Sequence, residues 1–199
     1  MQQRRTDRKA SDRRRAILDA AIRVIARSGV RGLRVEQVAD EAQVAVSLLY
    51  YYFGNRNGLV QATLDHANER AQAVVRNGDS GRRIVELTLL AELDSGSRDT
   101  SAVWAEVLAS AVFEPELRAG LQTAAQTWSE LIADAIRTGR SDGSISPQVD
   151  AQVSAERLTA LVEGLSAHWL AGIMTRTRAR QLLADGITLE LAGDGDRRR

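Results

Sequence analysis

The chain of 199 residues has no cysteine, only two prolines and only 4% aromatic residues. Without cysteine it can form neither disulfides nor thiolate metal sites, a composition that suits a reducing compartment. No apolar run approaches the ~20 residues of a membrane-spanning helix, and no apolar stretch follows the arginine-rich N-terminus as it would in a signal peptide. We therefore expect a cytoplasmic protein without a membrane partner.

The motifs of common enzyme classes are missing as well. The sequence has no paired histidines at metal-binding spacing, no glycine-rich phosphate loop and no nucleophile elbow. Its carboxylates are scattered, as expected for the surfaces of helices. We predict that the protein is not an enzyme and that it uses no cofactor and no metal ion.

Positive charge is concentrated at one end of the chain. Residues 1–34 hold eleven basic residues against three aspartates, a net charge of +8, whereas the whole chain has only +1, so the remainder has −7. This asymmetry indicates a polyanionic partner at the N-terminal end. The alternative for residues 1–12 is a flexible, solubilising arm.

The hydrophobic content of 44% and the helical spacing of apolar residues predict an all-α fold of about nine helices. No segment shows a convincing strand pattern. Clear breaks lie at 77–81 and 139–147, and residues 193–199 resemble a disordered tail. The expected helices cover 12–28, 35–42, 45–52, 56–76, 82–93, 100–113, 115–138, 150–173 and 177–191.

The segment 35–56, VEQVADEAQVAVSLLYYYFGNR, contains two short helical patterns joined by the three residues 43–45. Two short helices with such a tight corner form a helix-turn-helix, whose second helix can enter the major groove of DNA. A small core is expected beneath the motif, formed by Ile17, Ala21, Val24, Leu33, Val38, Val44, Leu49 and Phe53. Gly29 is expected to end the first helix.

The same residues resemble the TetR family of one-component repressors. The similarity lies in VEQVA (35–39), AQV (42–44), LYYYF (49–53) and GNRNGL (54–59), with ILDAA (17–21) and SGV (28–30) upstream. The sequence departs from the usual pattern at the corner, where the family has glycine and this chain has Gln43. It also has Ala45 for Ser or Thr, Ser47 and Leu48 before the Leu-Tyr pair, and Arg56 for Lys.

The resemblance implies that Val46 and Ser47 at the start of the recognition helix contact DNA, together with Leu48, Tyr50, Tyr51, Tyr52 and Arg56. The position of Arg34 before the motif and the positive charge of the arm add Arg34, Arg4, Arg5 and Arg8 to the expected contacts. Core packing of the tyrosines and a solvated Arg34 are the alternatives. Val46 and Leu48 can contact a thymine methyl group but cannot hydrogen-bond a base, so arm arginines or DNA shape should add specificity.

The C-terminal part is expected to sense a ligand and to dimerise. The segment 104–128 with its Pro-Glu-Leu at 115–117 resembles the regulatory half of BetI-like members of the family. Candidate ligand-binding residues are His66, Trp104, Phe113, Trp128 and Trp169, for which ordinary core packing is the alternative. The helices at 150–173 and 177–191 are expected to pair with a second copy through Leu158, Leu161, Leu165, Leu182, Leu183 and Ile187.

The resulting prediction has four segments. A basic flexible arm (1–12) precedes a helix-turn-helix domain (13–55), an effector-binding and dimerisation domain (56–192) and the tail (193–199). The expected function is a homodimeric repressor that binds a pseudo-palindromic double-stranded operator and is released by a small-molecule effector. The alternative is a DNA-binding regulator or architectural protein without an effector. The operator, the regulated genes and the effector are not encoded in recognisable motifs.

Overall fold

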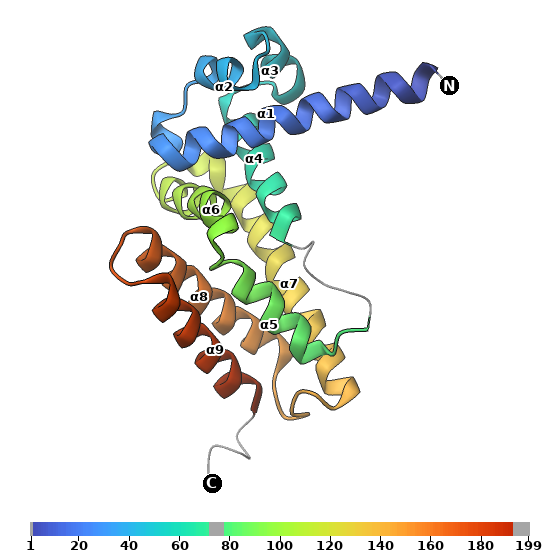
Figure 1. The fold of residues 1–199 in the computed structure, drawn as a ribbon, viewed down its shortest axis with the longest axis vertical. Helices are drawn as coiled ribbons and strands as arrows, with labels where there is room; N and C mark the ends of the chain where they lie inside the picture. The colour runs from blue at the N-terminus through green and yellow to red at the C-terminus, as the bar shows by residue number, and fades with distance from the viewer. Residues whose placement is uncertain (1, 72–77, 193–199) are drawn as a thin grey trace. The chain divides into compact units, whose positions relative to one another are not determined.

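A computed structural model describes the backbone of residues 2–71 and 78–192, and the side chains of 10–69 and 78–192. Within these ranges the chain forms nine α-helices, two short 3₁₀ helices and no strand, which confirms the all-α prediction (Figure 1). The α-helices are α1 (Gln2–Gly32), α2 (Val35–Ala42), α3 (Val46–Phe53), α4 (Arg56–Ala71), α5 (Gly81–Ala91), α6 (Arg98–Ala111), α7 (Arg118–Asp142), α8 (Ala151–Leu170) and α9 (Arg176–Ala192). The 3₁₀ helices are η2 (Ser95–Ser97) and η3 (Pro115–Leu117). None of the described helices combines the length and apolarity needed to cross a membrane.

The helices belong to two compact units. The N-terminal unit comprises Met1–Ala67 and Ala102–Gln122, and the C-terminal unit comprises Asn68–Ser101 and Thr123–Arg199. The N-terminal unit thus holds more than the expected helix-turn-helix domain, because it also includes most of α4 and α6 and the start of α7. The functional division at residue 56 stays a prediction.

Helix α1 begins much earlier than expected. The sequence suggested a flexible arm up to residue 12, but the backbone is helical from Gln2. Residues 2–12 contain neither glycine nor proline and are rich in arginine and glutamine, which favour helix, so nothing in the segment stops the helix. The side chains of Arg4, Arg5 and Arg8 lie outside the described part, as does the predicted tail at 193–199.

The core of the N-terminal unit lies where α1, α2 and α3 meet. The expected core residues Ile17, Ala21, Val24, Leu33, Val38 and Leu49 are all buried. Val44 and Phe53, also expected there, are only half-buried because they lie at the edge of the motif. The guanidinium of Arg14 covers the ring of Phe53 at 5.5 Å. Gly29, with φ 70° and ψ 171°, interrupts the helical backbone of α1 at the position predicted for its end.

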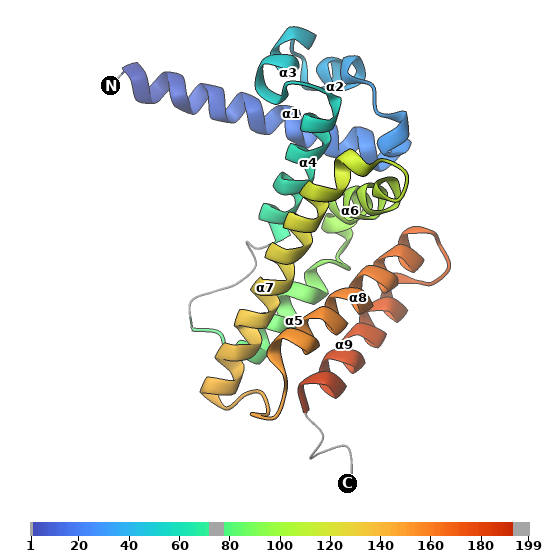
Figure 2. The same ribbon diagram turned by 180° about the vertical axis from the view of Figure 1, so that it is seen from behind.

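The C-terminal unit has a large apolar core formed by α5, α7, α8 and α9. Figures 1 and 2 show α8 and α9 running side by side. Gly186 of α9 contributes to this closeness, because a Cβ there would collide with the side chain of Leu161 on α8. The buried residues include Val85, Leu89, Trp128, Ile132, Ile136, Val162 and Leu191.

The dimer-interface prediction needs a correction at four of its six residues. Leu158, Leu165, Leu183 and Ile187 are all at most 7% exposed and form part of the core of their own subunit. Leu161 and Leu182 are half-buried against the same core. The helical period in the sequence identified an apolar face correctly, but it does not say whether the same chain or a second copy covers that face.

Helix α7 continues through the break expected at residue 139. Gly139 lies inside the helix, where a Cβ would collide with the side chain of Ile145, and a Cβ on Gly81 would in turn collide with the backbone of Gly139. The carbonyl of Gly139 accepts a hydrogen bond from the N–H of Ile145 at 2.9 Å, which helps to close the end of the helix. The chain turns at Gly143, whose φ is 80°.

Candidate nucleic-acid interface

The turn between α2 and α3 is fixed by backbone hydrogen bonds. The N–H of Gln43 donates to the carbonyl of Asp40 at 3.1 Å, and that of Val44 to the carbonyl of Ala39 at 3.0 Å. Gln43 has φ 54° and ψ 47° and is the only non-glycine residue of the described chain with positive φ. A residue with a Cβ costs about 1–2 kcal/mol in this left-handed region. The tight corner of a helix-turn-helix is therefore present, with backbone strain at Gln43.

The three tyrosines of α3 differ in their exposure to solvent. Tyr51 is 81% exposed and Tyr50 is 48% exposed, whereas Leu49 is buried in the core. Tyr52 is half-buried, with its ring edge-on to that of Tyr51 at 5.4 Å and its hydroxyl 3.5 Å from the carbonyl oxygen of Ala10 on α1. Tyr51 thus points outward most fully, while Tyr52 lies along α1.

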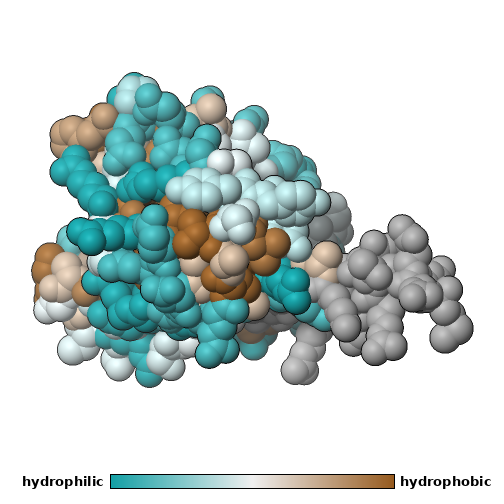
Figure 3. Space-filling model, turned by 90° about the horizontal axis from the view of Figure 1, so that it is seen from above, coloured by the Kyte–Doolittle hydropathy of each residue, from teal (hydrophilic) through white to brown (hydrophobic). Residues whose placement is uncertain are grey.

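A shallow hollow lies beside α3, lined by Arg13, Gln43, Val44, Ala45, Ser47, Leu48 and Tyr51. Its lining is mixed, since Val44, Ala45 and Leu48 are apolar while Arg13 supplies a positive charge. Figure 3 views the side on which α2 and α3 lie and shows apolar surface there enclosed by polar residues. Arg13 and Gln43 were not among the sequence-based site residues, although the run of arginines at 13–15 and the unusual corner residue were visible signals.

The other residues predicted to contact DNA differ in exposure. Ser47 is exposed, and Val46 and Leu48 are half-buried at the start of α3. Arg34 is exposed at the N-cap position of α2, where its carbonyl accepts the N–H groups of Gln37 and Val38. Its side chain is therefore open to solvent, as a phosphate-binding arginine must be.

Arg56 has a different environment from the one expected. Its Nε donates to the carbonyl of Leu33 at 3.3 Å, and its terminal nitrogen donates to the carbonyl of Val30. An ion pair of 3.7 Å also joins its Nη1 to the Oε2 of Glu114. The guanidinium thus helps to hold the connection between α1 and α2, and a phosphate contact of Arg56 stays a prediction.

Glu106 of α6 holds the same connection from another side. Its Oε2 accepts the N–H of Val30 at 3.1 Å. Gly29 suits its positive φ of 70°, and a Cβ there would lie 2.6 Å from this oxygen and displace the Glu106 carboxylate. Sequence reasoning could not find this contact, because the two residues are 76 positions apart.

Glu41 links α2 to α1 through two arginines. Arg27 and Arg23 both hydrogen-bond its carboxylate, the Nε of Arg23 at 2.6 Å. These hydrogen bonds hold the pKa of Glu41 at about 2, well below its ordinary 4.5. A carboxylate of the helix-turn-helix is thereby paired with positive charges of the same chain.

The five candidate ligand residues do not share one unit. His66, Trp104 and Phe113 lie in the N-terminal unit, and Trp128 and Trp169 lie in the C-terminal unit. The Nε2 of His66 is 3.0 Å from the Oδ1 of Asp19. Phe113 is 70% exposed, with the guanidinium of Arg31 5.0 Å from its ring.

In the C-terminal unit Trp128 is buried in the core, and Trp169 is half-buried with the guanidinium of Arg98 5.8 Å above its ring. The ring of Trp169 therefore already faces a cation. Trp104 in the N-terminal unit is half-buried on α6. The packing of His66 and the exposure of Phe113 make these two poor candidates for lining a ligand cavity.

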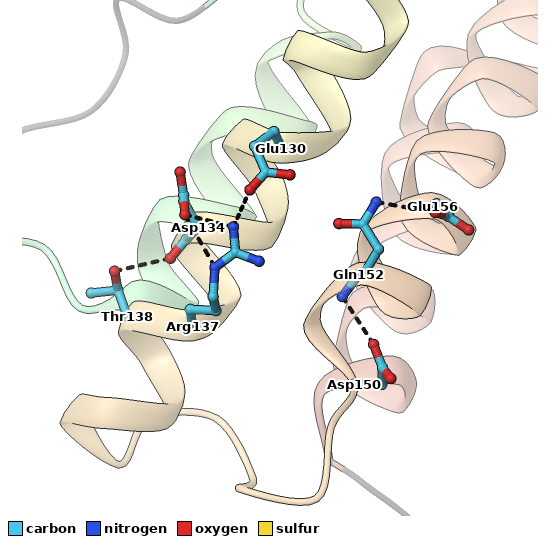
Figure 4. Close-up of polar contacts among 7 residues, drawn as sticks. All are labelled: Glu130, Asp134, Arg137, Thr138, Asp150, Gln152 and Glu156. Carbon is cyan, nitrogen blue, oxygen red and sulfur yellow. Dashed lines mark hydrogen bonds and ion pairs between the residues drawn. The ribbon is translucent and has the colours of Figure 1, made fainter.

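The polar groups drawn in Figure 4 make local contacts within α7 and at the start of α8. The Oδ1 of Asp150 accepts the N–H groups of Gln152 at 3.0 Å and Val153 at 3.1 Å, and so caps α8. Arg137 pairs with Asp134 and Glu130 on the exposed face of α7, where such pairs contribute little. Among the side chains that the structure describes, no three His, Asp or Glu residues gather as metal ligands would.

Two family models match this sequence. The model of bacterial regulatory proteins of the TetR family matches residues 17–63, which include the whole helix-turn-helix. The model of the BetI-type transcriptional repressor C-terminal region matches residues 79–192. The second match covers more than half of the chain.

Individual relatives agree with these matches along nearly the whole chain. A candidate TetR-family regulator from Rhodococcus sp. is 41% identical with a TM-score of 0.87, covering 92% of this chain and 100% of that structure. A candidate transcriptional regulator from Saccharomonospora viridis, solved with choline, is 29% identical with a TM-score of 0.73, covering 89% and 96%. The regulator BetI of Burkholderia cenocepacia is 29% identical over 92% of this chain and 95% of its own length.

Proposed function

The chain belongs to the TetR family of transcriptional regulators, and from this premise we propose that it is a homodimeric, ligand-responsive repressor of a pseudo-palindromic operator. That it is a DNA-binding regulator and not an enzyme follows from the family, as the sequence predicted. The fine details, namely the dimer, the operator and the effector, are the proposal. They rest on the geometry of α3, α8 and the aromatic residues of the C-terminal unit.

The observation that carries the proposal is the outward placement of α3. Its inward residue Leu49 is buried in a firm core, while Tyr51 and Ser47 are exposed beside the positively charged rim at Arg13. A short helix held rigidly with one free face can enter a major groove. The exposed arginines Arg13 and Arg34 can then bind the phosphates on either side.

Selection of genomic fragments by the full-length protein tests this role. Fragments retained at physiological salt should share a short inverted repeat, and footprinting should show protection limited to that repeat. Tyr51→Ala should weaken binding to the repeat without changing the melting temperature. Ala109→Ser, on the exposed surface of α6, serves as the matched control. Uniform retention of all fragments would instead support an architectural DNA-binding protein.

A dimer is proposed through the outer face of α8. Val153, Ala160, Gly164 and Ala167 are exposed and share one side of the helix, as their spacing of seven, four and three residues requires. The small residues among them permit a second helix to approach closely. The exposed Leu189 of α9 adds an apolar side chain to this proposed interface.

Gly164 gives a sharp test of this interface. A Cβ at Gly164 would meet no atom within 4 Å in its own subunit, so a larger side chain does not disturb the fold. Gly164→Glu should yield a folded monomer in sedimentation experiments and lower operator affinity roughly a hundredfold, because two linked half-sites are lost. Gly164→Ala should stay dimeric. A wild-type protein that sediments as a monomer at micromolar concentration would refute the proposed dimer.

The effector is proposed to be a small organic molecule bound in the C-terminal unit. The relative from Saccharomonospora viridis was crystallised with choline, which makes choline the first probe. Trp169 already holds the guanidinium of Arg98 over its ring, and an aromatic face of this kind suits a quaternary ammonium group. An effector that couples to DNA by 1–3 kcal/mol would weaken operator binding about 5- to 150-fold.

Titration of the protein–operator complex with choline tests this point. We expect choline to release the operator, and Trp169→Ala to abolish the release while leaving affinity for the operator unchanged. Trp169→Phe is the matched control because it keeps an aromatic ring. Operator affinity that is unchanged by choline and by related ammonium compounds would favour the alternative, a DNA-binding regulator without an effector of this class.

A further inference from the structure

Helix α3 lacks the side chains with which proteins most often read bases. Its sequence, VSLLYYYF, contains no Arg, Lys, Asn, Gln, Asp or Glu. The bidentate contacts of Arg with guanine and of Asn or Gln with adenine are therefore unavailable from this helix. Among the side chains of this helix, only the hydroxyl groups of Ser47 and the tyrosines can hydrogen-bond, and each does so through a single oxygen atom.

The adjoining turn supplies what the helix lacks. Gln43 is exposed, and its amide side chain lines the hollow beside α3 together with Leu48 and Tyr51. An amide is the group that pairs with both N6 and N7 of adenine in the major groove. The apolar Ala45 and Leu48 lie in the same hollow, where they can contact the 5-methyl group of thymine.

The backbone gives a second, independent reason to look at Gln43. It has φ 54° and ψ 47°, where a residue with a Cβ is strained and glycine is not. Strain of this kind persists at functional sites when the side chain is needed there. Nothing in the fold of the corner requires the amide, because the hydrogen bonds of the turn are made by backbone atoms.

We propose that Gln43 and Leu48 together read an A·T base pair in each operator half-site. Gln43 bonds the adenine edge, Leu48 with Ala45 contacts the thymine methyl group, and Arg13 at the rim of the hollow binds a neighbouring phosphate. This inference rests on the proposed function, since it needs an operator. It adds the identity of the base pair and assigns specificity to a turn residue outside the recognition helix.

Modified bases test the two contacts separately. The probe is the shortest genomic fragment that the full-length protein retains, synthesised with single substitutions at each A·T pair of a half-site. At one pair, 7-deazaadenine should weaken wild-type binding roughly fivefold, because it removes the N7 acceptor. Uracil for the paired thymine should weaken binding roughly fourfold, because one methyl contact is lost.

Variants then assign each effect to a side chain. Gln43→Gly should lose the sensitivity to 7-deazaadenine and keep the sensitivity to uracil, while its melting temperature rises as the strain is relieved. Leu48→Ala should show the opposite pattern of sensitivities. Ala109→Ser on the exposed surface of α6 is the control and should keep both.

The outcomes are distinguishable. If the protein selects no fragment specifically, the proposed repressor function fails and this inference fails with it. If a fragment is bound tightly but tolerates both modified bases at every A·T pair, only the inference is overturned. Gln43→Gly that gains stability yet still discriminates against 7-deazaadenine would show that the amide makes no base contact, and would also overturn it.

Discussion

Glu41 in the N-terminal unit and Glu92 in the C-terminal unit are carboxyl groups whose pKa values shift in opposite directions. The pKa of Glu41 falls to about 2 because Arg27 and Arg23 hydrogen-bond its charged form. The pKa of Glu92 rises to about 7 because burial at the end of α5 disfavours its charge. One unit surrounds its carboxylate with arginines, whereas the other excludes water from it.

This difference reflects what each unit must leave exposed. The N-terminal unit keeps one face of α3 free, so long polar side chains such as Arg56 and Glu106 fix its helices from the edges. The C-terminal unit can bury most of its apolar side chains between helices and forms a continuous core. The stability of the polar contacts in the N-terminal unit therefore depends on salt concentration and pH, whereas that of the C-terminal core depends on close packing.

The largest expected effect on stability comes from a substitution in the core of the C-terminal unit. Leu183 is fully buried between α9 and its neighbours. Leu183→Ala should lower the free energy of unfolding by about 2–5 kcal/mol, measured by urea denaturation, because it leaves a cavity. Asp185→Ala on the same helix is the control, since Asp185 is exposed. Equal effects of the two substitutions would contradict the core described for this unit.

The next effect concerns the buried charge of Glu92. Its pKa in the folded state, about 7, lies above the ordinary 4.5, so its contribution favours folding at low pH and is lost as pH rises through 7. Glu92→Gln should therefore raise the free energy of unfolding at pH 8 by about 2 kcal/mol, allowing for partial exposure. The gain should vanish near pH 4. A variant that is no more stable than the wild type at pH 8 would show that the carboxyl is well solvated.

Local patterns made the helices predictable, because an apolar stripe of period 3.6 is encoded within a few turns. The corner at 43–45 and the interruption of α1 at Gly29 were predictable as well, because each is encoded by a few neighbouring residues. The sequence does not show which surface covers each apolar stripe. Leu158 and Leu183 were therefore assigned to a dimer interface, although they pack inside their own chain. The start of α1 was missed because charge was taken as a sign of flexibility.

A smaller effect is expected from the polar contacts of the N-terminal unit. Arg56→Ala removes hydrogen bonds to the carbonyls of Val30 and Leu33, and should cost about 1–2 kcal/mol of unfolding free energy. Arg34→Ala is the control, because Arg34 is exposed and should change DNA affinity and not stability. If Arg56→Ala weakened DNA binding with no loss of stability, Arg56 would contact phosphate directly.

The hydrogen-bond partners of Arg56 could not be found from the sequence because they are distant in it. Val30 and Leu33 lie 26 and 23 positions earlier, so no local pattern connects them with Arg56. The family resemblance supplied a DNA contact for this position, but this chain turns the guanidinium inward. Resemblance thus located the motif well, whereas the direction of individual side chains depended on contacts between separate helices.

The smallest effect is expected at Glu41, where the pair with Arg23 and Arg27 is largely exposed to solvent. Its folded-state pKa of about 2 lies below 4.5, so the pair stabilises fully above pH 4.5 and its contribution is lost as pH falls toward 2. Solvent screening limits the effect, so Glu41→Gln should cost about 1 kcal/mol at pH 7 and nothing near pH 2. Urea denaturation at 1 M NaCl should reduce this difference further. A difference that persists undiminished at both low pH and high salt would mean that Glu41 acts through packing, and the contrast between the two units would disappear.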